Sequence, residues 1–394
     1  MNLRFFASFA VISALTSVLA CSAAGDGSQT QGSGNNGSGA SSSTGNQPSF
    51  GGSSVGTGNQ PSLGGGINAN PLPKDPNDPR DVPVRPKICD AAGNCTCLRL
   101  ALVGTLESAA VAKDTQPFID WLNTNSDGTA TVTMVTTKPA INEAFLGMYD
   151  ILVVANVNGW AFSADEKAAV EKWVKEMGGG IVTLTGFNSM ATEPPATSQL
   201  VDFAGMGYTG SGEADWTAPH AGNVTPIHYN GGAVDLRNCL NLWSNAVDKE
   251  AANTTAIQFT PQTGALVDLT ASLTYVGAYI GWPVKAPAGS TVLATDPMSG
   301  KNMAVAYEVD GKGRILSFGD EWIVFTNQWT PLGTFTDARM DANNMCWQAT
   351  PDPGFFHSVK SLYQTKQFWY NAINWVAPPS ECNFTITDDD VVVK

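Results

Sequence analysis

The sequence has few charged residues and very few histidines. Asp, Glu, Lys and Arg make up 14 % of the 394 residues, well below the roughly 25 % of an average soluble protein, and only three histidines are present. Acidic residues outnumber basic ones by 35 to 21, so the formal net charge is -14 and no cluster of cations is available to bind phosphates. This balance weakens the case for nucleic acid as a partner, and we expect none. No Gly-rich phosphate loop follows a predicted strand, and we expect no cofactor.

The shortage of charge is most extreme in one segment. Residues 22–70 hold one charged side chain, Asp26, in 49 positions, of which 14 are Gly, 11 Ser and 6 Asn. A segment of this composition cannot bury enough apolar surface to offset the entropy lost on ordering. We therefore predict a disordered tether over residues 21–70. Six prolines in residues 71–87 predict a stiffer, extended spacer before the folded domain.

The first residues have the pattern of an export signal. An apolar stretch from Phe5 to Ala20 is too short to span a bilayer as a helix, and we predict a signal peptide over residues 1–20. It ends Val18-Leu19-Ala20-Cys21, which resembles a bacterial lipobox. The resemblance implies cleavage before Cys21 and attachment to a membrane through lipid on that residue, and Ser22 implies the outer membrane or cell surface. An ordinary signal peptide with an incidental Cys21 is the alternative.

Six cysteines lie in the predicted folded domain, residues 88–387. An even number in an exported chain predicts up to three disulfides. Cys95-Thr-Cys97 is not a C-x-x-C redox motif, and no histidine pair with the spacing of zinc ligands accompanies it, so disulfides are favoured over a metal site. Six cysteines allow 15 connectivities, and the sequence leaves them open. The pairing that we favour is Cys89–Cys95, Cys97–Cys382 and Cys239–Cys346.

Strands alternate with helices through the first half of this domain. Ser163-Ala-Asp-Glu166 is a capping box, an apolar stripe from Val170 to Met177 follows it, and Gly178 ends the helix. The alternation predicts an α/β fold with a mostly parallel, flavodoxin-like sheet. Strands are expected at residues 98–104, 130–136, 151–157 and 181–185, and two further helices at 117–123 and 141–148.

The second half predicts an antiparallel C-terminal extension of that sheet. Three apolar runs, residues 290–294, 303–309 and 314–318, are separated by turns, and Asp310-Gly311 between two of them is a hairpin signal. An amphipathic helix from Phe368 to Val376 closes the domain, and residues 388–394 are expected to be a loose tail.

Several of these segments together resemble the class I glutamine amidotransferase-like fold, including its trehalose-utilisation-protein-like members. The resemblance is carried by Tyr149–Val154, the capped helix, Gly178–Gly180, Ile181–Gly186 and Gly311–Trp322. Residues 88–384 also resemble secreted bacterial lipoproteins built on this fold, through Cys95-Thr-Cys97, Gly319–Trp322 and Gln367–Ala372. The resemblance implies a fold and assigns no activity.

The residues that carry amidotransferase chemistry are missing. In that family a cysteine occupies the turn after the strand that follows the capped helix, and a histidine activates it. Here the turn reads Leu184-Thr185-Gly186-Phe187-Asn188, with neither a cysteine nor a G-x-S-x-G serine. Where the family has its His-x-Glu pair, this chain has Asp320-Glu321. The sequence therefore predicts a domain without amidotransferase activity.

Polar and aromatic residues follow several predicted strands, where parallel α/β sheets bind their ligands. Amides and carboxylates pair with hydroxyl groups, and an indole covers the apolar face of a sugar ring. We therefore predict a binding or structural role, with an envelope or extracellular glycan as the expected ligand. Packing remains the alternative for the tryptophans, because most of the 11 in the chain must pack. The candidate residues are Asn156, Asn158, Trp160, Thr185, Asn188, Asp320, Glu321 and Trp322.

A carboxylate-dependent hydrolase is the alternative function. Asp320 and Glu321 would act as acid and base with His220, which lies in a loop that could cover the site. Neighbours in a strand point to opposite faces, so this cooperation needs a turn between the carboxylates. A calcium site with Asp337 and Asp341 is a further alternative, but nothing resembles an EF-hand loop, and solvated loop carboxylates are the simpler interpretation of that pair.

Overall fold

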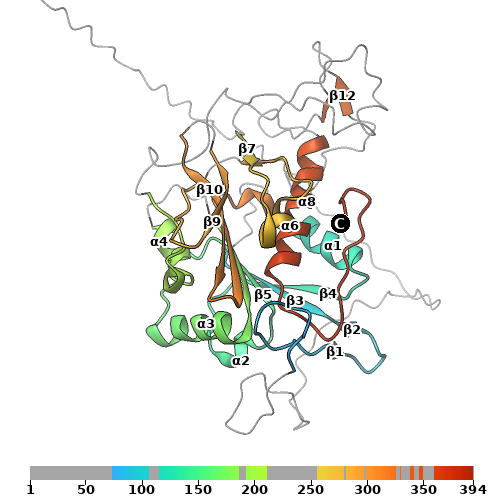
Figure 1. Cartoon of the computed structure of the whole chain (residues 1–394), viewed down its shortest axis with the longest axis vertical. Coiled ribbons are helices and arrows are strands. Elements are labelled where there is room, and N and C mark those ends of the chain that lie inside the picture. The colour runs from blue at the N-terminus through green and yellow to red at the C-terminus, as the bar shows by residue number, and fades with distance from the viewer. Residues whose placement is uncertain are drawn as a thin grey trace, which may run out of the picture. The chain divides into compact units, whose positions relative to one another are not determined.

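A nine-stranded mixed sheet forms the centre of the folded domain (Figure 1). The computed structural model describes residues 73–105, 115–185, 192–210, 255–278, 281–296, 299–324, 329, 338–340, 346–348 and 359–393. All of them fall within one structural unit, Gln60–Lys394. The predicted signal peptide and tether, together with Cys21, Asn188, His220, Cys239, Asp337 and Asp341, lie outside the described residues.

Five neighbouring strands of the sheet are parallel. In spatial order they are β4 (Ala130–Val135), β3 (Leu98–Val103), β5 (Ile151–Val154), β6 (Gly180–Leu184) and β11 (Gly313–Phe318). Counted along the chain this order is 2-1-3-4-5, the flavodoxin-like arrangement. Four antiparallel pairings continue the sheet from β11 through β10 (Asn302–Val309), β9 (Thr291–Thr295), β7 (Thr255–Phe259) and β8 (Tyr275–Ala278). The predicted fold class is confirmed.

Helices cover both faces of the sheet and enclose two hydrophobic cores. On one face α1 (Gln116–Asn125) and α8 (Val359–Val376) pack against side chains of β3 that include Leu100. On the other face α2 (Glu143–Leu146), α3 (Ala164–Met177) and α4 (Glu193–Ser198) share a core with β3 side chains that include Ala101. All six residues of β3 are buried, because successive side chains of a strand point to opposite faces and both faces are covered here.

The remaining elements are short. Two small two-stranded sheets pair β1 (Ile88–Cys89) with β2 (Cys95–Thr96) and β12 (Ala338–Met340) with β13 (Cys346–Gln348). The other helical segments are α6 (Val267–Thr270), η2 (Asp202–Ala204), η4 (Gly264–Leu266) and η5 (Trp322–Val324).

The capped helix is α3, and it forms as the sequence predicts. The Ser163 hydroxyl accepts from the Glu166 N–H at 3.1 Å, and the Glu166 carboxylate accepts from the Ser163 N–H at 2.9 Å. Gly178 ends the helix in the left-handed conformation, with φ of 71°. The predicted hairpin is also confirmed: β10 and β11 pair antiparallel, and Asp310 and Gly311 between them have φ of 52° and 71°.

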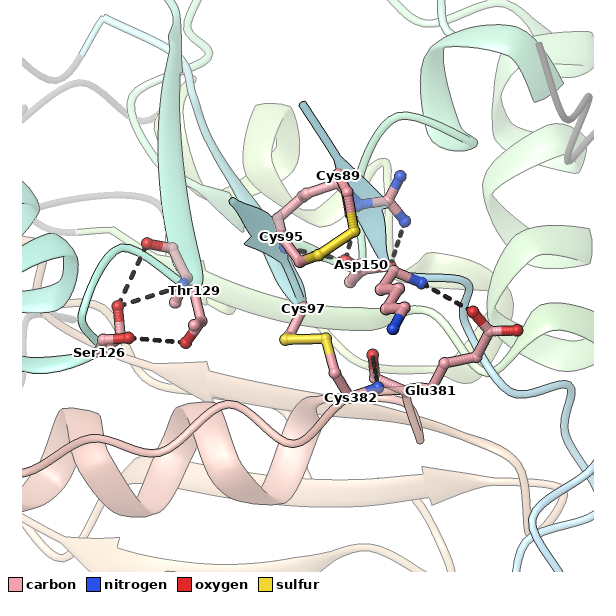
Figure 2. Close-up of a disulfide and its surroundings, with 12 residues drawn as sticks. Cys89, Cys95, Cys97, Ser126, Thr129, Asp150, Glu381 and Cys382 are labelled. Atoms are coloured by element: carbon pink, nitrogen blue, oxygen red, sulfur yellow. Dashed lines mark hydrogen bonds and ion pairs between the residues drawn. A yellow bond between two sulfur atoms is a disulfide. The ribbon is translucent and has the colours of Figure 1, made fainter. Parts of the chain in front are cut away.

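Two of the favoured disulfides are present. Cys89 is bonded to Cys95 within the small β1–β2 hairpin, and Cys97 is bonded to Cys382, 285 residues further along the chain (Figure 2). The second bond joins the start of β3 to the segment after α8. The third predicted pairing involves Cys239, which lies outside the described residues.

The predicted spacer differs from the structure. From residue 73 onward this segment packs on the domain, and Val82, Val84 and Arg85 are buried. The Arg85 N–H donates to the Pro379 carbonyl at 2.7 Å, and the Glu381 N–H donates to the Arg85 carbonyl at 2.8 Å. The expectation of an extended spacer was wrong for these residues. The apolar side chains between the prolines pack against the domain, and composition alone does not predict that contact.

The expectation of a loose tail was also wrong. Val391 is buried, and the Trp121 indole of α1 donates to the Asp388 carboxylate at 2.7 Å. Lys366 of α8 forms ion pairs with Asp388 and Asp390. Composition alone suggests that these aspartates are solvated, but they pair with helix side chains that are distant in sequence.

In the part of the chain that the structure describes, we find no helix whose length and apolarity would let it cross a membrane.

Candidate functional site at the strand ends

The carboxyl ends of the parallel strands meet at one edge of the sheet. The register places Val103 beside Val154, Val154 beside Thr183, and Leu184 beside Phe318. The segments that leave these strands are therefore neighbours. They carry five of the predicted site residues: Asn156 and Asn158 after β5, Thr185 after β6, and Asp320 and Glu321 after β11.

Asn156 fixes the point at which the strand order reverses. It has a positive φ of 54°, its side-chain amide donates to the Thr105 carbonyl at 3.1 Å, and the Thr105 N–H donates to the Asn156 carbonyl at 3.2 Å. Gly104 makes this approach possible, since a Cβ there would lie 1.7 Å from the Ala155 carbonyl oxygen. Asn156 thus holds the ends of β3 and β5 together, which is a positioning role.

Two side chains at this edge, those of Thr185 and Asn158, each carry a buried oxygen for which the described residues provide no hydrogen-bond partner. These atoms are the Thr185 hydroxyl oxygen, on a residue with no exposed surface, and the side-chain carbonyl oxygen of Asn158. The Asn158 amide nitrogen donates to Asn156 at 3.3 Å, which leaves its oxygen directed elsewhere. A buried polar group without a partner costs roughly 1–3 kcal/mol, so each of these atoms marks a place where a ligand or a water would be held.

The carboxylates at this edge are more buried than the sequence suggests. Asp320 and Glu321 both have no exposed surface, although their position after a strand is typical of solvated loop residues. Trp322 lies in η5, where its side chain is outside the described residues, and His220 is outside them too. The relation of the carboxylates to His220, on which the hydrolase alternative depends, is therefore untested.

Sequence reasoning missed a buried polar group on the α4 side of this edge. The Trp282 indole donates to the Glu193 carboxylate at 3.3 Å, and both residues have no exposed surface. The Trp282 N–H donates to the Gly319 carbonyl at 2.9 Å, so this pair lies against the segment that carries Asp320. Glu193 stands in Thr-Glu-Pro-Pro, which gives no signal of burial.

A hydroxyl network lies beneath the same edge. The Thr183 hydroxyl donates to Ser317 at 2.8 Å, and the Tyr208 hydroxyl donates to the Phe318 carbonyl at 3.0 Å while lying 2.9 Å from Thr183. Burial raises the pKa of the Tyr208 phenol, and the negative charge of Glu193 raises that pKa further. Tyr208 is therefore neutral at physiological pH and available only for hydrogen bonding.

Trp160 is half-buried and packs on the second core. Its ring lies 6.3 Å from that of Phe162 in an edge-on arrangement, and its carbonyl accepts from Gln199 at 3.3 Å. The packing interpretation of this tryptophan therefore has direct support. Among the described residues, no three His, Cys, Asp or Glu side chains gather as a metal site.

No family model and no curated protein matches the chain. Among solved structures, a cytoplasmic protein from Salmonella typhimurium LT2 aligns with 71 % of this chain and 100 % of its own, at 14 % identity and a TM-score of 0.38.

ThuA-like proteins are also among the structural neighbours. One from Parabacteroides merdae covers 57 % of this chain and 79 % of its own, at 14 % identity and a TM-score of 0.32. One from Bacteroides uniformis covers 57 % and 83 %, at 11 % identity and a TM-score of 0.34. The fold assignment itself rests on the strand order of this chain's own sheet.

Proposed function

We propose that the folded domain is a binding module of amidotransferase-like architecture without amidotransferase chemistry, and that its strand-end edge takes a carbohydrate. The observation that carries the binding role is the pair of buried, unpartnered oxygens of Thr185 and Asn158 on neighbouring strand ends. A threonine hydroxyl can donate and accept and an amide oxygen can accept, which matches the hydroxyl groups of a sugar. Thr185 also follows the strand after which an amidotransferase carries its cysteine.

A glycan array with the full mature chain tests this proposal. Thr185→Val keeps the shape of the side chain and removes the hydroxyl, so the affinity for a glycan hit should fall about fivefold, since a neutral hydrogen bond contributes about 1 kcal/mol. Thr124→Val, at an exposed position near the end of α1 and away from the strand-end edge, is the matched control and should change nothing. An array without hits, or hits that both variants retain in full, would refute the binding role.

The same proposal places the domain on the cell envelope. A lipid on Cys21, followed by a long tether of Gly, Ser and Asn, would hold a glycan-binding domain away from the outer membrane while keeping it at the surface. A clickable fatty acid fed to cells should label the protein, and Cys21→Ala should lose the label, whereas Ser22→Ala should keep it. A labelled Cys21→Ala chain would contradict lipidation at this residue.

A further inference from the structure

A second candidate site lies at the opposite edge of the sheet, near the amino ends of the strands. A cavity of about 240 Å³ is bounded by α2, α3 and the segment before β1. Leu146, Ala169, Trp173 and Met177 form its apolar wall, and Arg85 also lines it. Gly147, Lys172, Glu143 and Glu176 complete the lining, and Lys172 is already paired with Glu143 at 2.6 Å.

Arg85 is an unusual residue to find in this wall. Its side chain is 1 % exposed, and among the described residues none of its three guanidinium nitrogens has a hydrogen-bond partner. Its nearest acid is Asp150, at 3.7 Å, too far for a hydrogen bond. The guanidinium also lies 6.0 Å from the centre of the Trp173 ring.

The Asp150 carboxylate is occupied by another arginine (Asp150 is labelled in Figure 2). Arg99 donates to it from the backbone at 2.8 Å and from two guanidinium nitrogens at 2.9 and 2.7 Å. Two arginines thus share one carboxylate. The buried group formed by Arg85, Arg99 and Asp150 therefore has a net charge of +1, and the N–H donors that it leaves unused belong to Arg85.

A buried charge without hydrogen bonds is unfavourable, and an arginine fork matches the two oxygens of a carboxylate. Burial lowers the pKa of Arg85 to about 10, with Asp150 opposing that shift, so the side chain is still a cation at physiological pH. Trp173, on the same wall, carries a second buried donor, its indole nitrogen, which has no partner in the part of the chain that the structure describes.

We infer that this cavity binds a small organic carboxylate, with its head group on the Arg85 guanidinium and its apolar body against Trp173, Leu146 and Met177. The site is separate from the strand-end edge, since Asp150 immediately precedes β5 whereas Asn156 and Asn158 follow it. A failure of carboxylate binding would therefore leave the proposed glycan binding untouched, and the reverse also holds.

Titration of the full mature chain with phenylacetate, 4-methylvalerate, phenylacetamide and sulfate, followed by ligand-observed NMR and melting temperature, tests the inference. Phenylacetate or 4-methylvalerate should bind, and phenylacetamide, which lacks the charge, should bind at least tenfold more weakly than phenylacetate. Arg85→Met should abolish carboxylate binding.

Because Arg85→Met could unfold the chain, a second variant leaves Arg85 in place. Ala169→Phe fills the cavity from α3 and should weaken carboxylate binding at least tenfold. Ala168→Phe, at the exposed neighbouring position outside the cavity, should retain it. Equal binding of the acid and the amide, binding of sulfate alone, binding that survives Ala169→Phe, or no binding of either carboxylate would overturn the inference.

Discussion

At the scale of single residues, the capping glutamate of α3 does more than cap its helix. One Glu166 oxygen accepts from Lys138 at 2.6 Å and from the Ile141 N–H at 3.2 Å, while the other caps Ser163. Burial alone would raise the pKa of Glu166, but these hydrogen bonds and the Lys138 charge outweigh it and lower the pKa below its ordinary 4.5. The carboxylate therefore joins the start of α3 to the loop before α2.

Replacing this carboxylate should change how stability depends on pH. A carboxyl group whose pKa is lowered by folding stabilises the fold above its unfolded-state pKa, and that contribution is lost as the pH falls through the folded-state pKa. We expect Glu166→Gln to lower the free energy of unfolding at pH 7 by about 1 kcal/mol, a typical cap contribution. The difference from wild type should shrink as the pH falls below about 4.5 in urea titrations. Glu171→Gln, in a partly exposed pair on the same helix, is the control, and a pH-independent difference for Glu166→Gln would contradict this expectation.

Gly104 offers a sharper residue-scale test at the strand-end edge. Its φ of 126° disfavours any side chain, and a Cβ would collide with the Ala155 carbonyl. We expect Gly104→Ala to cost at least about 2 kcal/mol in urea unfolding, since strain and clash add. Gly159→Ala, at φ of 78° with nothing within 4 Å, should cost only about 1 kcal/mol from strain. Equal costs would show that β3 and β5 do not approach as closely as described.

At the scale of elements, local signals in the sequence predict structure where the determining contacts are also local. The capping box of α3, the Asp310-Gly311 turn and the continuous apolar run of β5 are of this kind, and all three form as expected. β7, β8 and α4 were not predicted, and α8 begins at Val359 rather than near Phe368. These elements depend on packing against distant parts of the chain, and α4 carries two prolines in its first turn, where a missing N–H costs nothing.

The two disulfides should contribute unequally to stability. In the chain-entropy model a bond stabilises more when it closes a longer loop, and the separations here are 285 residues for Cys97–Cys382 and 6 for Cys89–Cys95. We expect the double substitution Cys97→Ser with Cys382→Ser to cost about 5 kcal/mol, and that of Cys89 and Cys95 about 2 kcal/mol. Guanidinium unfolding measures both, and equal losses would mean that loop closure does not govern their effect.

At the scale of the whole molecule, the sequence predicts the fold better than the site. Strand order and helix coverage follow from patterns along the chain, and the edge where Asn158, Thr185 and Asp320 gather follows from the topology. The burial of Glu193 and Arg85 could not be predicted from the sequence. A charged residue beside prolines is expected to be solvated, and only the contacts that it makes with distant parts of the chain show otherwise. The shortage of charge in the sequence is most extreme in residues 22–70, the predicted tether, but the other 345 residues hold only 55 charged side chains and are low in charge as well.

The central claim is that this edge binds a sugar and does not transform it. Isothermal titration with the glycan that binds most strongly on the array measures binding. Chromatography of the same glycan after prolonged incubation with the protein shows whether it has been cleaved. We expect saturable binding that Thr185→Val weakens about fivefold, with the glycan recovered intact. Cleaved glycan, or binding that Thr185→Val leaves unchanged, would contradict it.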